Sequence, residues 1–374
     1  MDSSKIIEKY NEVQFPKLGW SFEIDQTAFT IGGISIQWYG LIIALGLTLA
    51  ALYCFPRMKR FGIDPDSSLD AVIGGILAGI VGARLYYVIP NFELFKGESF
   101  KETLISIFNI RNGGLAIYGG IIGALVVGII VCKIKKVKIL PMLDITSLGL
   151  LIGQGIGRWG NFINQEAFGT NTDSIFGMTG GRIQNVINAE MQKGGSLYEN
   201  GIEMVWSDPV HPCFLYESFW CLLGFVILAF YSKRRKYDGQ IFLLYLAWYG
   251  FGRAFIEGLR IDSLMLGSIR ISQALSIVLF IAAVILLIVI GFKVKRDPES
   301  FVLYAATEES RMLIEQARRK SMKGFDDSDD DEDDEIGILD DEDDDEEISV
   351  DSSASKNTGK ENSEIVTDDI IKED

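Results

Sequence analysis

The sequence predicts an all-α polytopic membrane protein with seven transmembrane helices, a small extracytoplasmic head and a disordered, acidic cytoplasmic tail. The first observation is a series of apolar runs of about 20 residues, the length that a helix needs to cross a hydrocarbon core of about 30 Å. The second is a sharp division of charge between this apolar body and the C-terminal segment. The predicted spans are residues 36–55, 69–90, 113–132, 139–160, 212–231, 240–258 and 269–292.

The net charge of −16 comes from the C-terminal segment. From Asp297 to the end, 29 acidic residues stand against 8 basic ones, a net charge of −21. The other 296 residues hold 22 acidic and 27 basic residues, a net charge of +5. The acidic pI therefore describes a tail and not the apolar body, and no nucleic-acid partner is expected.

Basic residues gather in the loops that follow spans one, three, five and seven, and such clusters mark cytoplasmic loops. We therefore expect the N-terminus outside and the acidic tail in the cytoplasm. No basic segment joined to a short apolar core precedes span one, so we expect insertion to use that span itself. The clusters are Arg57, Lys59 and Arg60; Lys133, Lys135, Lys136 and Lys138; Lys233, Arg234, Arg235 and Lys236; and Lys293, Lys295 and Arg296.

Three regions follow from this topology. We expect an extracytoplasmic N-terminal segment over residues 1–35, a seven-span membrane domain over residues 36–296 and a largely disordered cytoplasmic tail over residues 297–374. Within the tail, residues 298–324 have the composition of a short surface helix. The acidic runs beyond Phe325 carry too little apolar surface to offset chain entropy, which predicts disorder.

The extracytoplasmic segments have their own patterns. Alternating residues at Phe22–Asp25 and Ala28–Ile31, beside Gly32-Gly33, predict a short β-hairpin. The loop of about residues 162–211 is rich in Gly and Asn, which predicts a small irregular head. Its length is consistent with a lid, a docking surface or a passive loop.

Glycines recur at one-turn spacing within the spans, as in Gly75-x-x-x-Gly79, Gly119-x-x-x-Gly123 and the run from Gly149 to Gly157. Such faces let helices approach closely. The cysteines lie in or beside spans without paired spacing, which favours apolar packing over disulfides or a zinc site. They are Cys54, Cys132, Cys213 and Cys221.

The most informative run is Gly157–Gly169, at the outer end of span four. It carries Arg158, Asn161 and Glu166, and the first two lie three residues apart on one helical face. A guanidinium at membrane depth is costly, so intramembrane ionisable groups usually mark a site or a pathway.

Span six repeats this pattern. Tyr249, Arg253 and Glu257 fall at one-turn intervals on one face, and Arg260 follows. The structural alternative is that Arg253 and Glu257 only neutralise one another. Two arginines in two apolar spans predict that an anionic group is held there.

Further polar residues lie near span ends: Tyr39 in span one, Arg84 in span two, Tyr118 in span three and Asp144 near the inner end of span four. His211, the only histidine, precedes span five. Each has a structural alternative. Tyrosines form interfacial belts, Arg84 extends to lipid phosphates, and Asp144 pairs with a backbone or basic group.

These groups limit the chemistry. The sequence shows no Ser-His-Asp arrangement, no metal-ligand cluster and no phosphate-cradling loop after a strand. Two guanidiniums facing a cavity fit a phosphate, because the planar fork donates bidentate hydrogen bonds. In an alkyl transfer from a phosphodiester they would stabilise the charge that develops on the leaving phosphate. A nearby base would then serve the nucleophile.

Five motifs of this sequence resemble those of one family, the prolipoprotein diacylglyceryl transferases. The resemblance covers about residues 30–290. The resemblance implies an integral inner-membrane enzyme that moves the diacylglyceryl group of phosphatidylglycerol to the lipobox cysteine in the signal peptide of a prolipoprotein. It implies a thioether product, release of glycerol phosphate, and no metal or organic cofactor. The motifs are Gly157–Gly169, Trp38-Tyr39-Gly40, Gly113–Gly120, His211–Glu217 and Tyr249–Arg260.

The resemblance implies roles for Arg158, Asn161, Gly169, Arg253, Tyr249, Glu257, Tyr39, Glu166 and Asp144. The other polar residues near the span ends add Tyr118, Arg260, Arg84 and His211. These residues form a catalytic set, a substrate-binding set and a supporting set. The catalytic set is Arg158, Arg253, Tyr118, Tyr249 and Glu257; the substrate-binding set is Arg158, Asn161, Gly169, Tyr39, Arg253 and Arg260; the supporting set is Asp144, Glu166, Arg84 and His211.

One position departs from the family pattern. Many members have a histidine before the Gly119-Gly120 pair, whereas this chain has Tyr118. A tyrosine can donate a hydrogen bond but is a poor general base near neutral pH. The base assignment therefore does not carry over, and His211 is not its positional replacement.

Two other classes of function remain open from the residues alone. A transporter for an anionic solute would use the same intramembrane arginines, although the two halves show no evident inverted repeat. A non-enzymatic scaffold would use the acidic tail to recruit basic partners.

Overall fold

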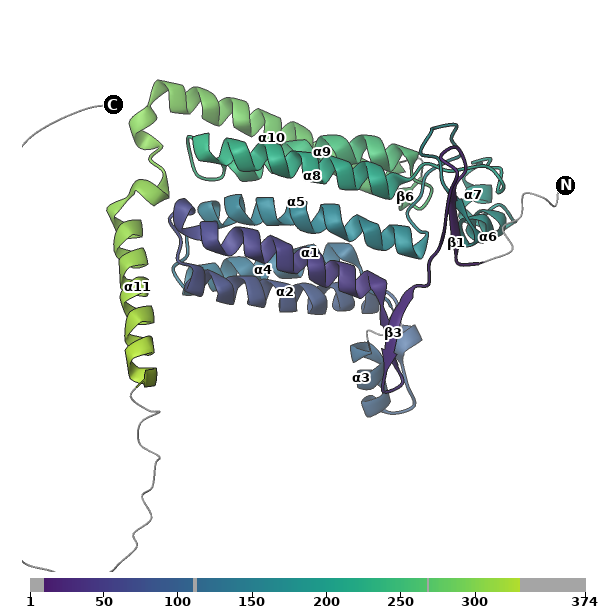
Figure 1. Cartoon of the computed structure of the whole chain (residues 1–374), viewed down its shortest axis with the longest axis horizontal. Helices are drawn as coiled ribbons and strands as arrows, with labels where there is room; N and C mark the ends of the chain where they lie inside the picture. The colour runs from purple at the N-terminus through teal and green to yellow at the C-terminus, as the bar shows by residue number, and fades with distance from the viewer. Residues whose placement is uncertain (1–9, 110–112, 268, 330–374) are drawn as a thin grey trace, which may run out of the picture. The chain divides into compact units, whose positions relative to one another are not determined.

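The computed structural model describes residues 10–109, 113–267 and 269–329. Each of the seven predicted apolar runs forms a helix, and these helices lie side by side in one bundle (Figure 1). Their bounds are α1 Trp38–Cys54, α2 Pro65–Val88, α4 Ile117–Ile134, α5 Ile139–Asn164, α8 Cys213–Tyr231, α9 Gln240–Leu259 and α10 Ile271–Arg296.

Six helices of the described residues are long and apolar enough to cross a membrane, as a polytopic membrane protein requires. They are α1 with the 3₁₀ turn η2 (Phe55–Phe61) that follows it, α2, α4, α5, α8 with its following turn, and α10. Helix α9 is not among them, since it carries Arg253 and Glu257 within its 20 residues. The count of seven spans therefore stays a prediction.

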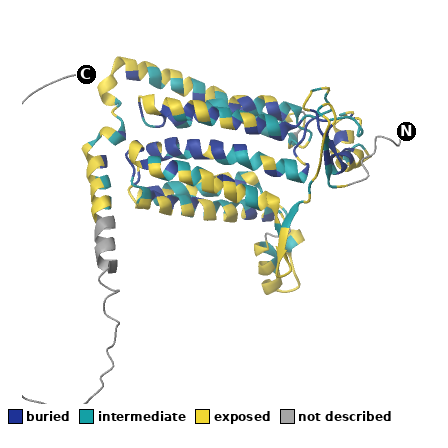
Figure 2. Ribbon diagram, in the orientation of Figure 1, coloured by how far each residue is buried: buried dark blue, intermediate teal, exposed yellow. Residues whose placement is uncertain are grey.

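Helix α5 is the most enclosed helix of the bundle. Half of its most apolar window is buried, against 11% for α1. It packs against α1, α8 and α9, and its dark colour in Figure 2 shows how little of it reaches the surface. Ile145, Leu148 and Leu151 are fully buried in the main core. The helix that bears Arg158 is thus held on several sides.

Glycines bring α2 and α4 into close contact, as their spacing predicted. A Cβ added to Gly119 would lie 2.3 Å from the carbonyl oxygen of Gly82, and one added to Gly123 would lie 2.3 Å from that of Ala78. Only glycine allows such an approach of two backbones. The four cysteines are buried free thiols, in keeping with a packing role.

One end of the bundle carries a small folded unit, which we name the head (residues 10–23 and 165–211). Its sheet has the order β2-β1-β5, all antiparallel. Val13, Ile183 and Leu197 are fully buried in a core of its own. The head was predicted to be irregular, and that prediction was wrong because a strand from the N-terminal segment completes it. Its elements are β1 Glu12–Phe15, β2 Trp20–Glu23, β5 Thr179–Gly180, α6 Gly181–Glu190 and α7 Ser196–Glu199.

The predicted hairpin forms around Gly32 and Gly33, whose φ angles are +56° and +81°. Its strands are β3 (Thr27–Ile31) and β4 (Ile34–Gln37). Phe22 was assigned to this hairpin, which is wrong, because it lies in β2 and pairs with Val13 of β1. Nearby are two unpredicted elements, η3 (Phe92–Phe95) and α3 (Phe100–Phe108).

At the opposite end, which we name the tail end, residues 298–319 form a C-terminal strap. The backbone N–H of Tyr304 donates to the Asp238 carboxylate (2.7 Å), and the buried Ser310 hydroxyl donates to the Gly62 carbonyl (2.8 Å). Burial raises the pKa of Asp238. The strap therefore joins the loop before α2 to the loop before α9. Its elements are η6 Pro298–Ser300, η7 Tyr304–Ala306 and the first part of α11 Glu308–Asp329.

The predicted short helix within residues 298–324 is confirmed by α11. This helix continues to Asp329, so the prediction of disorder directly after Phe325 was wrong for four residues. The rest of the predicted disordered tail, residues 330–374, lies outside the described residues.

Replacing Gly62 by alanine should test the strap. Gly62 has φ +81°, and an added Cβ would lie 2.6 Å from the Cα of Ala305 in the strap. Gly33 also has φ +81°, but an added Cβ there meets nothing within 4 Å. Both substitutions incur left-handed strain, and only Gly62→Ala adds a backbone clash of about 1–3 kcal/mol. Its thermal midpoint in detergent should fall about 2–10 °C further than that of Gly33→Ala. Equal midpoints would show that the strap does not bear on stability.

Candidate active site

Glu217 of α8 is the centre of a buried polar network at the head end of the bundle. Its side chain is 2% exposed. One carboxylate oxygen lies 2.8 Å from Nη2 of Arg158 and accepts a hydrogen bond from the Tyr249 hydroxyl (3.1 Å). The other accepts from Nη1 of Arg253 (2.7 Å). One carboxylate thus joins α5, α8 and α9, and these partners offset the cost of burying its charge.

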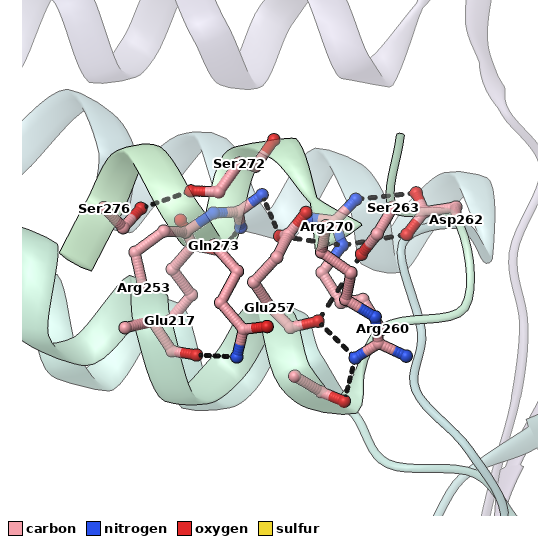
Figure 3. A network of polar contacts seen from close by, with 12 residues as sticks. Glu217, Arg253, Glu257, Arg260, Asp262, Ser263, Arg270, Ser272, Gln273 and Ser276 are labelled. Atoms are coloured by element: carbon pink, nitrogen blue, oxygen red, sulfur yellow. Dashed lines mark hydrogen bonds and ion pairs between the residues drawn. The ribbon is translucent and has the colours of Figure 1, made fainter. Parts of the chain in front are cut away.

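The second carboxylate of the network is Glu257, one turn after Arg253 on α9. Nη2 of Arg253 lies 2.5 Å from Oε2 of Glu257, so this guanidinium spans two carboxylates. Nε of Arg260 lies 3.9 Å from the same oxygen, and Arg260 forms a bidentate pair with Asp262 (2.8 and 2.6 Å). Figure 3 shows this chain of alternating charges. The predicted Arg253–Glu257 pairing is confirmed, and it forms part of a larger network.

Arg158 extends the network toward the head. Its Nη1 donates to Oδ1 of Asn161 (3.1 Å), whose Nδ2 donates to Glu166 (2.9 Å). The shared helical face of Arg158 and Asn161 is therefore confirmed. Helix α5 ends because Gln165 adopts a left-handed conformation, with φ +53°, which turns the chain back. This turn places Glu166 over the last turn of the helix.

Gly169 lies where two chain segments meet at the head end. Its backbone N–H donates to the His211 carbonyl (3.0 Å), and it forms a bridge with Arg260. An added Cβ would lie 2.8 Å from Cβ of His211 and 2.9 Å from the carbonyl oxygen of Leu259. A glycine is needed for this approach, which fixes the segment after α9 against the segment after α5.

The His211 side chain is not joined to the arginines. Its Nδ1 lies 3.2 Å from the Tyr216 hydroxyl, at the start of α8. Burial lowers the pKa of the imidazole, so the ring is neutral at pH 7. His211 therefore lies at the junction between the head and the helix bundle.

Tyr39 and Tyr118 lie beside the network without bonding to Glu217. The Tyr39 ring covers Gly160 of α5, where an added Cβ would lie 2.5 Å from a ring carbon. The Tyr118 hydroxyl lies 2.9 Å from the hydroxyl of Ser272, which joins α4 to α10. Both tyrosines thus link helices at the head end.

Two predicted supporting residues lie apart from the network. The five N–H groups of the Arg84 guanidinium all donate to backbone carbonyls, those of Ser106, Ile107, Asn109, Gly113 and Gly114. Because it is 6% exposed and fully bonded, the interpretation that Arg84 extends to lipid phosphates was wrong. Asp144 lies at the tail end and accepts from the backbone N–H groups of Gly239 and Phe242 (2.8 and 2.9 Å). It caps the first turn of α9, in keeping with its predicted backbone pairing.

Three residues of the network were not among the predicted site residues: Glu217, Asp262 and Arg270. Glu217 had a signal, because it is the only charged residue within the apolar run 212–231. Asp262 and Arg270 lie in the short connection between α9 and α10 and carry no such signal. Arg270 donates to the backbone carbonyls of Glu257 and Gly258.

The fold and the site together define a polytopic membrane protein with a buried arginine–carboxylate network at one end of its bundle. The sequence matches the family described as prolipoprotein diacylglyceryl transferase over residues 26–289. The chain belongs to the prolipoprotein diacylglyceryl transferase family. The network lies wholly within the matched segment, whereas the strap and tail lie beyond it.

Curated relatives are similar over most of their length, and each is named phosphatidylglycerol–prolipoprotein diacylglyceryl transferase. The protein of Clostridioides difficile is 39% identical over 274 residues, which cover 73% of this chain and 98% of that protein. The protein of Listeria innocua is 38% identical over 279 residues (75% and 94%). The protein of Finegoldia magna is 41% identical over 264 residues (70% and 94%).

Proposed function

We infer that this chain transfers the diacylglyceryl group of phosphatidylglycerol to the cysteine thiol of a prolipoprotein lipobox. A carbon–sulfur bond forms at the glycerol methylene, the bond from that carbon to the phosphate oxygen breaks, and glycerol phosphate leaves. The thiol proton is released. The observation that carries the proposal is the pair of arginines from two helices, Arg158 and Arg253, held by one carboxylate, Glu217. Family membership supports the same reaction.

The arginines stabilise the charge that grows on the departing phosphate. A guanidinium offers a planar fork to phosphate oxygens, and in a water-poor site such contacts are strong. Glu217 and Glu257 hold the guanidinium of Arg253 from two sides, so its direction is set before the substrate arrives. Preorganised charge of this kind lowers the barrier without reorganisation during the reaction.

The remaining residues of the proposed site form its surroundings. Asn161 and Glu166 continue the network from Arg158, while Tyr249 donates to Glu217. Tyr39, Gly169 and Arg260 bound the same end of the bundle. In this proposal they shape the place where the phospholipid headgroup binds. His211 and Arg84 hold other segments of that end, whereas Asp144 caps the first turn of α9 at the tail end.

The proposed setting is the bacterial cell membrane. The basic clusters support an orientation with the head outside and the C-terminal segment in the cytoplasm. The network then lies on the side where an exported prolipoprotein presents its signal peptide and lipobox cysteine. Phosphatidylglycerol reaches the site from the surrounding membrane lipids. The proposed regions are the extracytoplasmic residues 1–35, the membrane domain 36–296 and the cytoplasmic tail 297–374.

Tyr118→Phe tests how the thiol proton is handled. Our hypothesis is that the arginines dominate and that no strong base is specified, since the Tyr118 hydroxyl bonds to Ser272 (2.9 Å). Loss of this hydrogen bond alone is worth about 1 kcal/mol, so transfer should fall by less than about tenfold. Ser272→Ala removes the same bond from its other side and should match it. Full loss of transfer in Tyr118→Phe with normal activity in Ser272→Ala would instead assign the hydroxyl a role in proton transfer.

The function itself is tested with the purified full chain in vesicles that contain labelled phosphatidylglycerol. A lipobox peptide is added, with a Cys→Ser peptide as its control. We expect label on the cysteine peptide alone, with release of glycerol phosphate. Movement of an anion across the vesicle wall without transfer would favour a transporter, and neither activity would favour a scaffold. Either result would overturn the proposal.

A further inference from the structure

The connection from α9 to α10 folds back over the last turn of α9 (Figure 3). It contains the short strands β6 (Met265–Leu266) and β7 (Ile269–Arg270), which pair antiparallel. This hairpin returns the chain so that Arg270 and Gln273 lie against the end of the helix that they follow.

The end of a helix leaves backbone carbonyls without N–H partners from its own turns. Arg270 donates from Nη1 to the carbonyls of Gly258 and Glu257, the latter at 3.1 Å. The Ser263 hydroxyl lies 3.4 Å from the Glu257 carbonyl. A cation at this position also complements the negative end of the helix dipole. Arg270 is thus a side-chain cap for α9.

Gln273 makes a related contact one turn earlier. Its Nε2 donates to the carbonyl of Ala254 (2.8 Å). That carbonyl lies inside the helix, where the N–H four residues ahead already serves it. The Gly258 carbonyl is at the helix end, where no such N–H follows. The contact of Arg270 should therefore matter more than that of Gln273.

The capped turn carries part of the proposed site. Glu257 pairs with Arg253 at 2.5 Å, and Arg260 directly follows the helix. Both side chains keep their positions only while α9 remains helical to Leu259. The Glu257 carbonyl also accepts from the Arg260 N–H (3.2 Å), so removal of the cap leaves the part-buried Gly258 carbonyl without its donor. Such a loss is costly and should unwind this turn and release Glu257 from Arg253.

We propose that Arg270 is a positioning residue, which acts by capping α9 and so holds Glu257 and Arg260 in place for catalysis. This inference rests on the proposed transferase function. Arg270 acts through the backbone, so its loss should lower kcat more than it raises the KM for phosphatidylglycerol. A purely structural role would lower the thermal midpoint and leave kcat at 25 °C unchanged.

The test compares Arg270→Ala, Arg270→Lys and Gln273→Ala in full-length protein, with labelled phosphatidylglycerol vesicles and a lipobox peptide. Ser276→Ala is the matched control, because among the residues that the structure describes its hydroxyl bonds only within α10, to the Ser272 carbonyl (2.7 Å). We expect kcat to fall about 10- to 100-fold in Arg270→Ala and less in Gln273→Ala. Lysine can still donate to both carbonyls, so Arg270→Lys should recover most of the loss.

Unchanged kcat in Arg270→Ala, or no recovery in Arg270→Lys, would overturn the inference. If the Arg270→Ala protein does not accumulate, Arg270→Lys remains the test. A kcat for Arg270→Lys below that for Gln273→Ala would then overturn the inference. Absence of transfer by the wild-type chain would overturn the proposed function instead, so the two failures are distinct.

Discussion

Glu217→Gln should reduce the rate of diacylglyceryl transfer by about 10²-fold or more. The amide keeps the size of the side chain, but it replaces one oxygen by an N–H donor. In the native protein both oxygens face guanidinium N–H groups, at 2.8 Å from Arg158 and 2.7 Å from Arg253. One arginine would then face a donor instead of an acceptor and would turn away. Breaking a buried ion pair by removing one partner's charge costs about 3–5 kcal/mol.

Asp70→Asn is the matched control for this substitution. Asp70, which lies in α2, also pairs with a basic residue, Lys135. Both side chains of this pair are about half exposed. An exposed pair of this kind is worth about 0–1 kcal/mol, so transfer should stay within about fivefold of the wild type. A Glu217→Gln protein that transfers as fast as Asp70→Asn would show that Glu217 does not organise the site.

Arg253→Lys should reduce transfer by about 10- to 100-fold, although it preserves the charge. The guanidinium presents Nη1 to Glu217 and Nη2 to Glu257, at 2.7 and 2.5 Å. A lysine ammonium is a single point on a flexible stem and lacks this fixed fork. It would leave one buried carboxylate short of its partner and would lose the bidentate approach to phosphate. The measurement is kcat/KM for phosphatidylglycerol.

Arg319→Lys provides the comparison for Arg253→Lys. Arg319 pairs with Glu315 on α11 at 2.6 Å, but the side chains are 75% and 62% exposed. Lysine serves equally well at such a site, so activity should not change. If Arg253→Lys is also fully active, the charge alone suffices and the geometry of the fork is not used.

The helices could be predicted from the sequence because the bilayer sets the length of an apolar run. Their ends could not, because local capping decides them. Helix α2 begins at Pro65, four residues before the predicted apolar run, since the Asp64 side chain accepts from the N–H of Ser67 (2.8 Å). Helix α5 ends at Asn164 because Gln165 adopts a left-handed conformation. The length of an apolar run carries neither signal.

The site was predicted where its contacts are local. Arg158 with Asn161, and Arg253 with Glu257, follow from helical spacing, and both contacts form. Glu217 was missed as a site residue because its partners lie on two other helices. Its role depends on tertiary packing, which one sequence does not reveal.

Arg84 and Asp144 show the converse. Both are charged residues in apolar helices, the pattern that marks functional sites. In the structure Arg84 binds loop carbonyls and Asp144 caps α9. Such structural uses of a buried charge look the same in sequence as catalytic ones. The partners that separate them are backbone groups, which carry no residue-specific signal.

The central claim is that Arg158 and Arg253, organised by Glu217, act on the phosphate of phosphatidylglycerol. The most direct test measures transfer from labelled phosphatidylglycerol to a lipobox peptide by the Arg158→Ala protein. Glu217 would still be held by Arg253 and Tyr249 in this variant, so the fold should persist. We predict that the thioether product falls to background while the protein still folds, with a thermal midpoint no lower than that of Glu217→Gln. Undiminished transfer by Arg158→Ala would contradict the claim.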